Sequence, residues 1–400
     1  MMDREQKKQF VMCYAVFFMN GMLALSIGSL LPFVRDARGL DYAFCGLIVS
    51  LHSVGNLISS FAAGALPIAI GRKKSILLFE FFYPVSYLII LFADSRLLLA
   101  CAFFATGLAR GATSNYCNTK INSIATGKAW ALNALHACFA TGAFLFPLLL
   151  LAITRDGGDA RWMIACGIMT AAGCLVWILY LFMPEPEGDR VRASAKADAG
   201  DEDGASAFGF LAEPLFWICL GTLFFYLCAE QGVIGWMITY FKDTGLIAAH
   251  LSQITASVLW VMILCGRLTV AFLSTKLPKE NLLPVMGFGI VGFFVLLILS
   301  KSIVPIMIGI MGFGFSMAGI YATVVSFAGR LIKKYTLAWS FILTGASFGS
   351  ILMPSVIGNV AEHAGIAVGM STVALVLVVD MILIFALVHY VKKHKEIVQA

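Results

Sequence analysis

Residues 55–67 read GNLISSFAAGALP, and residues 266–278, which begin 211 positions later, read GRLTVAFLSTKLP. Five of the thirteen positions carry the same residue in both stretches: a glycine, a leucine, a phenylalanine and the closing Leu-Pro pair. Each stretch ends the second long apolar run of its half of the chain. The match therefore predicts a duplicated chain whose two halves run in parallel order, as in two-lobed secondary transporters.

The composition predicts that both halves lie in a membrane. Of the 400 residues, 60% are hydrophobic and 12% are charged, whereas an ordinary soluble domain has roughly 25% charged residues. A water-soluble globule cannot hide so many apolar side chains, because its surface must be largely polar. A soluble enzyme, a secreted disulfide scaffold and a disordered chain are therefore excluded.

Twelve apolar runs are long enough to cross about 30 Å of hydrocarbon as helices. They cover residues 10–34, 43–70, 75–93, 97–121, 129–153, 162–183, 214–241, 250–275, 281–300, 303–329, 336–360 and 366–391. The predicted fold class is an all-α polytopic membrane protein with twelve transmembrane helices in two six-helix bundles. We expect an N-terminal bundle of residues 1–183, a flexible cytoplasmic linker of residues 184–213 and a C-terminal bundle of residues 214–400.

The positions of Lys and Arg orient the predicted helices. If both termini lie on one side, the segments on that side hold 18 of the 28 bases, and the opposite segments hold 7. Because cytoplasmic loops carry the excess of Lys and Arg, both termini are expected in the cytoplasm. The net charge of +6 is then mostly a topology signal, and no nucleic-acid partner is expected. We expect a monomer in the cytoplasmic (inner) membrane, with the lipid bilayer around it.

A glycine- and arginine-containing connection follows the second span. Residues 64–73 read GALPIAIGRK. This connection resembles that of the major facilitator superfamily, which reads G-x-L-A-D-R-x-G-R-K/R, although Ile68 and Ala69 replace the acid and the first arginine. The resemblance implies a transporter of two pseudo-symmetric bundles. The expected cytoplasmic gate consists of Gly64, Gly71, Arg72 and Arg267.

Three segments are most similar to the fucose/glucose permease group of sugar:proton symporters. Residues 133–147, NALHACFATGAFLFP, are similar to N-x-L-H-x-x-F-G-x-G-A-x-x-x-P. Residues 226–240, YLCAEQGVIGWMITY, are similar to Y-x-G-x-E-x-x-x-G-x-W-x-x-T-Y. Residues 107–118 partly fit G-L-G-x-G-x-x-D-x-x-x-N, but Ser114 stands at the position of the acid. The group's coupling chemistry therefore cannot be transferred directly.

Few ionisable residues fall inside the predicted spans. The only Asp or Glu residues there are Glu80, Glu230 and Asp380, and the only Lys or Arg residues are Arg110, Lys120 and Arg267. Each of these residues needs a structural or functional explanation, because placing a charge at membrane depth costs at least about 2.5 kcal/mol. Glu230 lies in the middle of the seventh span, which the resemblance places along the cavity, and it is the predicted proton-coupling residue. The alternative is a static partner for Arg110 or Arg267. Local pairing or packing is expected for Glu80 and Asp380.

Small and amide side chains form a stripe on the fourth span, within a sector of roughly 100°. Such a face packs through small residues or lines a wet cavity, and amides suit a hydroxyl-rich ligand.

Asn133 and His136 share a face of the fifth span. Trp236 could stack on a sugar or belong to an aromatic belt, and Tyr321 could face the cavity or the core. The predicted substrate-binding residues are Asn20, Asn115, Asn118, Asn133, His136, Gln231, Trp236 and Tyr321.

Arg110 decides between two kinds of substrate. It neutralises Glu230, binds a substrate carboxylate through its planar fork, or has a packing role. The predicted function is secondary active transport of a small polar solute, a sugar, by alternating access with protons. The alternatives are an organic-anion or acid-sugar transporter that uses Arg110, a metabolite or drug efflux antiporter, and a receptor that keeps the transporter fold.

Enzymatic and metal chemistry are not expected. The sequence has no HExxH motif and no pair of intramembrane aspartates. The ten cysteines all lie in apolar runs, without a CxxC or a Cys/His cluster at metal spacing. We therefore predict no catalytic residue, no metal and no cofactor.

Overall fold

The computed structural model describes residues 4–125, 129–155, 158–184, 208–248 and 251–394. Twelve of its helices are long and apolar enough to cross a membrane, where α11 and α12 together count as one span of residues 303–327. The predicted all-α membrane fold with twelve transmembrane helices is therefore confirmed. Most of the predicted linker falls on residues 185–207, which lie outside the described residues.

The first six spans are α1 (Arg4–Arg38), α2 (Tyr42–Ile70), α3 (Arg72–Phe92), α4 (Arg96–Ile124), α5 (Ala129–Thr154) and α6 (Trp162–Phe182), with a 3-10 turn, η1 (Asp159–Arg161), before α6. After the linker come a second 3-10 turn, η2 (Gly209–Ala212), then α8 (Pro214–Thr244), α9 (Ser252–Leu273), α10 (Lys279–Leu299), α11 (Ile303–Met317), α12 (Ile320–Phe327), α13 (Gly329–Lys334), α14 (Thr336–Ala364) and α15 (Ile366–Lys393).

The chain divides into two compact units. The first contains residues 1–196 and 250–257, and the second contains residues 197–249 and 258–400. The start of α9 thus groups with the first unit, although the sequence places the whole helix in the C-terminal bundle. The bundle limits at residues 183 and 214 remain predictions.

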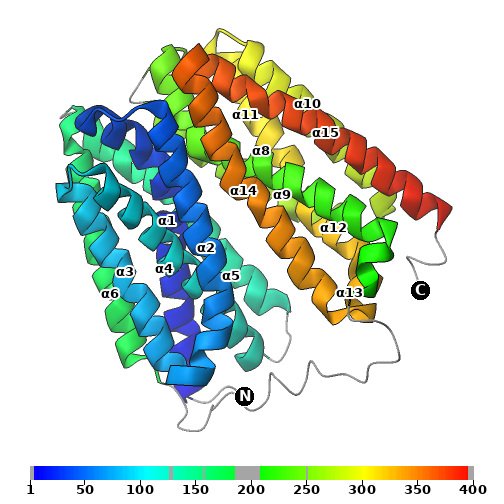
Figure 1. The fold of residues 1–400 in the computed structure, drawn as a ribbon, viewed down its shortest axis with the longest axis horizontal. Coiled ribbons are helices and arrows are strands. Elements are labelled where there is room, and N and C mark those ends of the chain that lie inside the picture. The colour runs from blue at the N-terminus through cyan, green and yellow to red at the C-terminus, as the bar shows by residue number, and fades with distance from the viewer. Residues whose placement is uncertain (1–3, 126–128, 156–157, 185–207, 249–250, 395–400) are drawn as a thin grey trace. The chain divides into compact units, whose positions relative to one another are not determined.

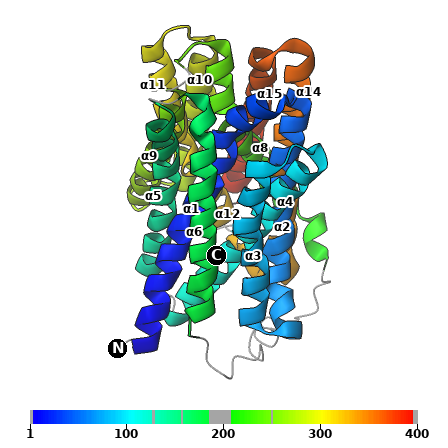
Figure 2. The same ribbon diagram turned by 90° about the vertical axis from the view of Figure 1, so that its left-hand side faces the viewer.

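Within the first unit, the helices pack in pairs. Helix α2 packs along α4, α1 packs along α5, and α3 lies against both α4 and α6 (Figures 1 and 2). Within the second unit, α8 packs against α14 and α15, and α10 packs against α11 and α15 (Figure 1).

The duplication is visible in the close approaches of these helices. A Cβ atom on Gly55 would overlap the carbonyl oxygen of Phe104, and one on Gly266 would overlap that of Phe315. The glycine and the phenylalanine of the second contact each lie 211 positions after their counterparts in the first contact. Because only glycine lets two helix backbones approach so closely, the repeated glycines fix equivalent helix crossings in both units.

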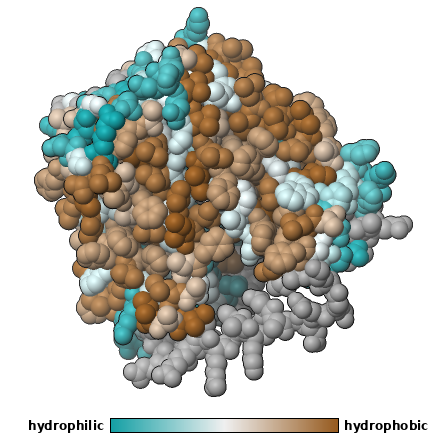
Figure 3. All heavy atoms as spheres, viewed as in Figure 1, coloured by the Kyte–Doolittle hydropathy of each residue, from teal (hydrophilic) through white to brown (hydrophobic). Residues whose placement is uncertain are grey.

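The surface is that of a protein solvated by lipid. Figure 3 shows a face that is mostly hydrophobic, with hydrophilic residues gathered near helix ends. Large apolar side chains are exposed in both units, among them Phe92 at 70% and Leu375 at 71%. Since monomeric soluble proteins rarely expose large contiguous apolar patches, this surface fits a hydrocarbon environment.

Polar contacts gather where α1 meets α2 and α3 meets α4. Asp41 caps α2 by accepting a hydrogen bond from the backbone N–H of Phe44 at 2.6 Å, and its other oxygen pairs with Arg96 at 2.7 Å. Arg38 pairs with Asp94 at the same loops. These pairs hold the helix ends of the first unit together outside the apolar spans.

Candidate functional site

Glu230 is the acid at the centre of α8. It lies sixteen residues after Pro214 and fourteen before Thr244, and its side chain is half-buried. The hydroxyl of Tyr226, one turn earlier on α8, donates a hydrogen bond to Oε1 of Glu230 at 3.2 Å. The Tyr321 ring of α12 lies 6.3 Å from the Tyr226 ring, measured between centroids. We call Tyr226, Glu230 and Tyr321 the α8 acid cluster.

The second unit has two more charged residues inside its predicted spans, namely Arg267 of α9 and Asp380 of α15. Arg267 is exposed, whereas Asp380 is completely buried. Neither carboxyl oxygen of Asp380 has a hydrogen-bond partner among the residues that the structure describes. The local pairing expected for Asp380 is therefore absent from the described residues, and the side chain is packed inside the second unit.

The amide stripe of α4 is hydrogen-bonded within the first unit. Asn20 of α1 donates to Ser114 Oγ at 3.0 Å, and Asn118 donates to the backbone oxygen of Ser114 at 2.7 Å. Asn115 donates to the backbone oxygen of Ser60 in α2 at 3.0 Å. Asn115 and Asn118 are half-buried, but Asn20 is 2% exposed. Asn20 thus fills the α1–α4 interface and offers almost no surface to a solute.

Arg110 lies at the midpoint of α4, fourteen residues from either end, and it contacts a histidine of α2. Its Nη1 lies 3.4 Å from Nε2 of His52, whose Nδ1 lies 2.8 Å from Thr106 Oγ1. Thr106 donates to the carbonyl of Phe103 at 2.6 Å. Since a guanidinium only donates, His52 accepts at Nε2 and donates from Nδ1, which is the neutral tautomer. Sequence analysis missed this pairing, because it depends on where α2 and α4 cross.

Asn133 and His136 are both exposed on α5. The His136 ring lies edge-on to Phe17 of α1, with 5.5 Å between centroids. On the second unit, Gln231 and Tyr321 are half-buried. All four predicted substrate residues are therefore at least partly exposed, in contrast to Asn20.

Trp236 requires a correction. Its side chain has no exposed surface, and its indole Nε1 donates to the backbone oxygen of Pro354 at 3.1 Å. The ring therefore joins α8 to α14, and it has no free face on which a sugar could stack. Neither predicted role, sugar stacking or membership of an aromatic belt, fits a side chain that is enclosed between α8 and α14. The sequence does not reveal this packing, because the residue lies in an apolar run that is compatible with all three roles.

The predicted gate residues fall in both units. Gly71 ends α2 and precedes α3 with a φ of 85°, which glycine adopts readily. Gly64 and Arg72 line a cavity beside this turn. Arg267 is exposed near the end of α9.

Tyr226, which the sequence analysis did not select, lies four residues before Glu230, and this spacing would place it on the same helix face.

A family model and curated relatives match most of the chain. A model of the Major Facilitator Superfamily matches residues 12–336. The protein TsgA of Shigella flexneri is 22% identical over 386 residues, which cover 95% of this chain and 94% of TsgA. TsgA of an Escherichia coli O17:K52:H18 strain is 21% identical over 385 residues, with the same coverage.

Two solved structures share the fold. A point mutant of the nucleoside transporter NupG has a TM-score of 0.77 at 13% identity, and the match covers 95% of this chain and 98% of NupG. A bacterial homologue of the human lysosomal transporter Spinster, inward-facing and occupied, has a TM-score of 0.77 at 13% identity, with 97% of each chain covered. The chain therefore belongs to the Major Facilitator Superfamily, and it is a multi-pass secondary transporter of small solutes.

Proposed function

We propose that the chain transports a neutral sugar or sugar-like solute together with protons, and that Glu230 carries the proton. The observation that carries this proposal is the half-buried carboxylate of Glu230 at the centre of α8, which receives a hydrogen bond from Tyr226 at 3.2 Å. A titratable group at membrane depth is a functional candidate by default, because its charge is costly there.

The coupling follows from the cost of enclosing a charge. When Glu230 is ionised, the Tyr226 hydroxyl donates to it. When Glu230 is protonated, its own O–H can donate and the Tyr226 oxygen can accept, so the contact survives the change of charge. The neutral form costs less to enclose in a water-free environment. A proton on Glu230 would therefore favour the closed intermediate through which alternating access passes.

The solute would be held by amide, imidazole and phenol groups. Asn133 and His136 supply such groups on the first unit, and Gln231 and Tyr321 supply them on the second. They present both donors and acceptors, which suits hydroxyl groups. One structural neighbour is named as a nucleoside transporter. Because a nucleoside contains a sugar, nucleosides belong in the first ligand screen beside hexoses.

The test is uptake into proteoliposomes, after a thermal-shift screen has identified a solute that raises the midpoint of unfolding. An inwardly directed proton gradient should drive uphill accumulation by the wild type. Glu230→Gln should abolish accumulation but keep counterflow of labelled solute, which needs binding and alternation without a net proton step. Glu80→Gln, a buried acid of the first unit, is the matched control and should still accumulate solute. Uphill uptake by Glu230→Gln would overturn the coupling role.

A second candidate function rests on Arg110. Its guanidinium is half-buried at the midpoint of α4, where it could hold the carboxylate of an acid sugar through paired hydrogen bonds. If this function is correct, a uronate should outcompete the neutral sugar, and Arg110→Lys should lose the uronate selectively. If Arg110→Lys loses the uronate and the neutral sugar equally, the role of Arg110 is its structural contact with His52.

A further inference from the structure

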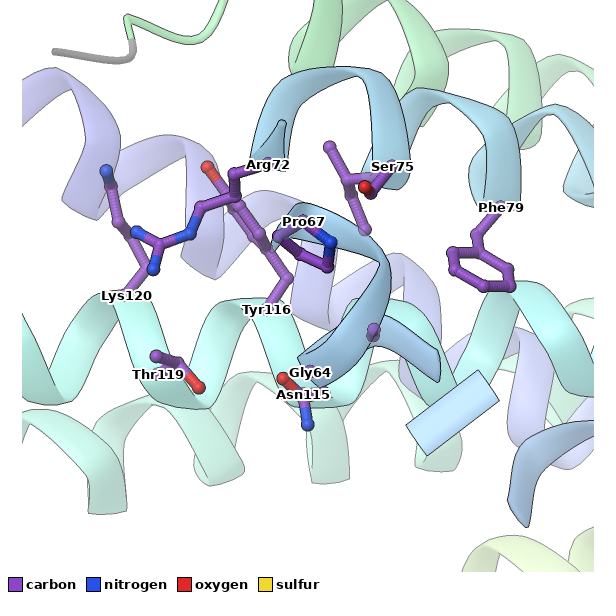
Figure 4. Close-up of a pocket in the computed structure, with 11 residues that line it drawn as sticks. Gly64, Pro67, Arg72, Ser75, Phe79, Asn115, Tyr116, Thr119 and Lys120 are labelled. Atoms are coloured by element: carbon purple, nitrogen blue, oxygen red, sulfur yellow. The ribbon is translucent and has the colours of Figure 1, made fainter. Parts of the chain in front are cut away.

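A cavity of about 250 Å³ lies at one end of the first unit, where α2 ends, α3 begins and α4 ends (Figure 4). Its walls come from the last turns of α2, the first two turns of α3 and the last turns of α4. The positions of Lys and Arg predict that this end faces the cytoplasm. At about 30 Å³ per water, the cavity has room for about eight waters, which suits one small solute rather than a ligand of drug size.

Gly64 of α2 lies on the wall of this cavity. A Cβ atom on Gly64 would meet no atom within 4 Å, whereas one on Gly55 of the same helix would overlap the carbonyl oxygen of Phe104. Helix packing therefore requires a glycine at Gly55 but not at Gly64. Since glycine weakens a helix interior, the benefit of Gly64 is the open space itself, which a longer side chain would enter.

Neutral hydrogen-bonding groups line the cavity. Asn115 and Thr119 lie one turn apart on α4, along one side of it (Figure 4). The amide of Asn115 donates to the backbone oxygen of Ser60 at 3.0 Å, so its carbonyl oxygen can still accept. Ser75 of α3 donates to the backbone oxygen of Gly71 at 2.8 Å, and its oxygen can likewise accept. Thr119 is exposed, and its hydroxyl can donate or accept. These groups suit the O–H groups of a polyhydroxy molecule.

The rest of the wall favours a neutral ligand over a charged one. Pro67, Ile76 and Phe79 supply apolar surface, against which the C–H groups of a sugar ring can pack. Arg72 and Lys120 also line the cavity, but each already has interactions of its own, so they do not require an anionic ligand. Among the described residues that line the cavity, none is Asp or Glu, which disfavours a cationic ligand.

We propose that this cavity is a second binding site for a neutral polyhydroxy solute, in the part of the first unit that is predicted to face the cytoplasm. Sequence analysis selected Asn115 as a substrate residue and Gly64 and Arg72 as gate residues, and all three line this one cavity. A solute bound there would lie on its way between the membrane interior and the cytoplasm. The inference rests on the solute class of the proposed function, but not on the proton role of Glu230.

The test is alkylation of a thiol placed in the cavity. Thr119→Cys introduces a thiol at an exposed residue of the cavity wall. The purified full chain in detergent reacts with N-ethylmaleimide in the presence of D-glucose, D-galactose or L-fucose, and mass spectrometry measures the labelling rate at each cysteine. At least one sugar should slow labelling of the new thiol saturably, by about tenfold at ten times the half-protecting concentration. The exposed Cys174 of α6 is the internal reference and should keep its rate.

Two glycine variants, each combined with Thr119→Cys, assign the protection to the cavity. In Gly64→Met the longer side chain occupies the cavity, so labelling of the new thiol should no longer depend on the sugar. Gly167→Met is the matched control, because Gly167 is also an exposed helical glycine of the first unit whose Cβ would meet no atom within 4 Å. It should keep the protection. Neither variant should lower the midpoint of thermal unfolding, since methionine favours helices more than glycine does.

Protection that survives Gly64→Met would come from a conformational change elsewhere, and it would overturn the proposal. So would the absence of protection by all three sugars. Glu230→Gln, combined with Thr119→Cys, should keep the protection even if it loses proton-driven accumulation. A sugar that raises the unfolding midpoint of the wild type without protecting the new thiol would exclude the cavity site and leave the proposed function intact.

Discussion

The hydroxyl of Tyr226 lies 3.2 Å from Oε1 of Glu230, one helical turn further along α8. Both residues come from one helix, so the contact does not depend on how other helices are arranged. Glu80 also accepts a hydroxyl hydrogen bond, from Thr113, but Glu230 differs from Glu80 and Asp380 in that its side chain is partly exposed.

Tyr226→Phe should weaken proton-driven accumulation and leave counterflow intact. The variant keeps the ring and removes one hydrogen bond, which contributes about 0.5–1.5 kcal/mol. We therefore expect a fall in uphill uptake of between about twofold and tenfold, measured in proteoliposomes. Tyr240→Phe, a buried position on the same helix, should behave like the wild type. Full accumulation by Tyr226→Phe would show that the hydroxyl does not assist Glu230.

Gly142→Ala and Gly349→Ala should both destabilise the chain, each in its own unit. An added Cβ would overlap the carbonyl oxygen of Phe18 in the first unit and that of Phe224 in the second. Overpacking of this kind costs about 1–3 kcal/mol, visible as a lower midpoint of thermal unfolding in detergent. Gly64→Ala is the control, since its Cβ would meet nothing within 4 Å, and its midpoint should stay or rise. Wild-type midpoints for Gly142→Ala and Gly349→Ala would contradict the close crossings.

The sequence predicts the helices well, because their apolar runs must match the membrane thickness. It also identifies Gly55 and Gly266 as equivalent, and the structure explains why both must be glycine. Contacts between helices are harder to predict. The Arg110–His52 contact depends on the α2–α4 crossing, and the burial of Trp236 depends on which face of α8 meets α14. Hydrophobic periodicity does not settle that face, since lipid-facing and core-facing side chains are both apolar.

Asp380→Leu should raise the midpoint of thermal unfolding. Asp380 is fully buried, and neither carboxyl oxygen has a hydrogen-bond partner among the described residues. An unsatisfied buried polar group costs about 1–3 kcal/mol, which an apolar side chain of similar size avoids. The midpoint of Asp380→Asn should lie between the midpoint of Asp380→Leu and that of the wild type. In Glu80→Leu the hydroxyl of Thr113 loses its acceptor. The midpoint of that variant should therefore rise less than the midpoint of Asp380→Leu. A large loss of stability in Asp380→Leu would reveal a partner of the carboxyl.

Asp41 should make the first unit sensitive to acid. The hydrogen bond from the backbone N–H of Phe44, together with Arg96, lowers the pKa of Asp41 below its ordinary value of 3.8. A lowered pKa means that the stabilisation is fully present above the unfolded-state pKa and disappears as the pH falls through the folded-state pKa. Asp41→Ala should therefore cost about 1 kcal/mol near neutral pH, as for the loss of an N-cap. The difference from the wild type should begin to shrink below about pH 4, where the carboxyl of the unfolded state takes up its proton, and should disappear once the pH is below the lowered folded-state pKa. Thermal unfolding of both proteins between pH 3 and 7 measures this difference.

Asp36→Ala, which removes a more exposed carboxylate beside Arg35, should show a smaller change. A constant difference between wild type and Asp41→Ala down to pH 3 would mean that the ionised cap does not contribute.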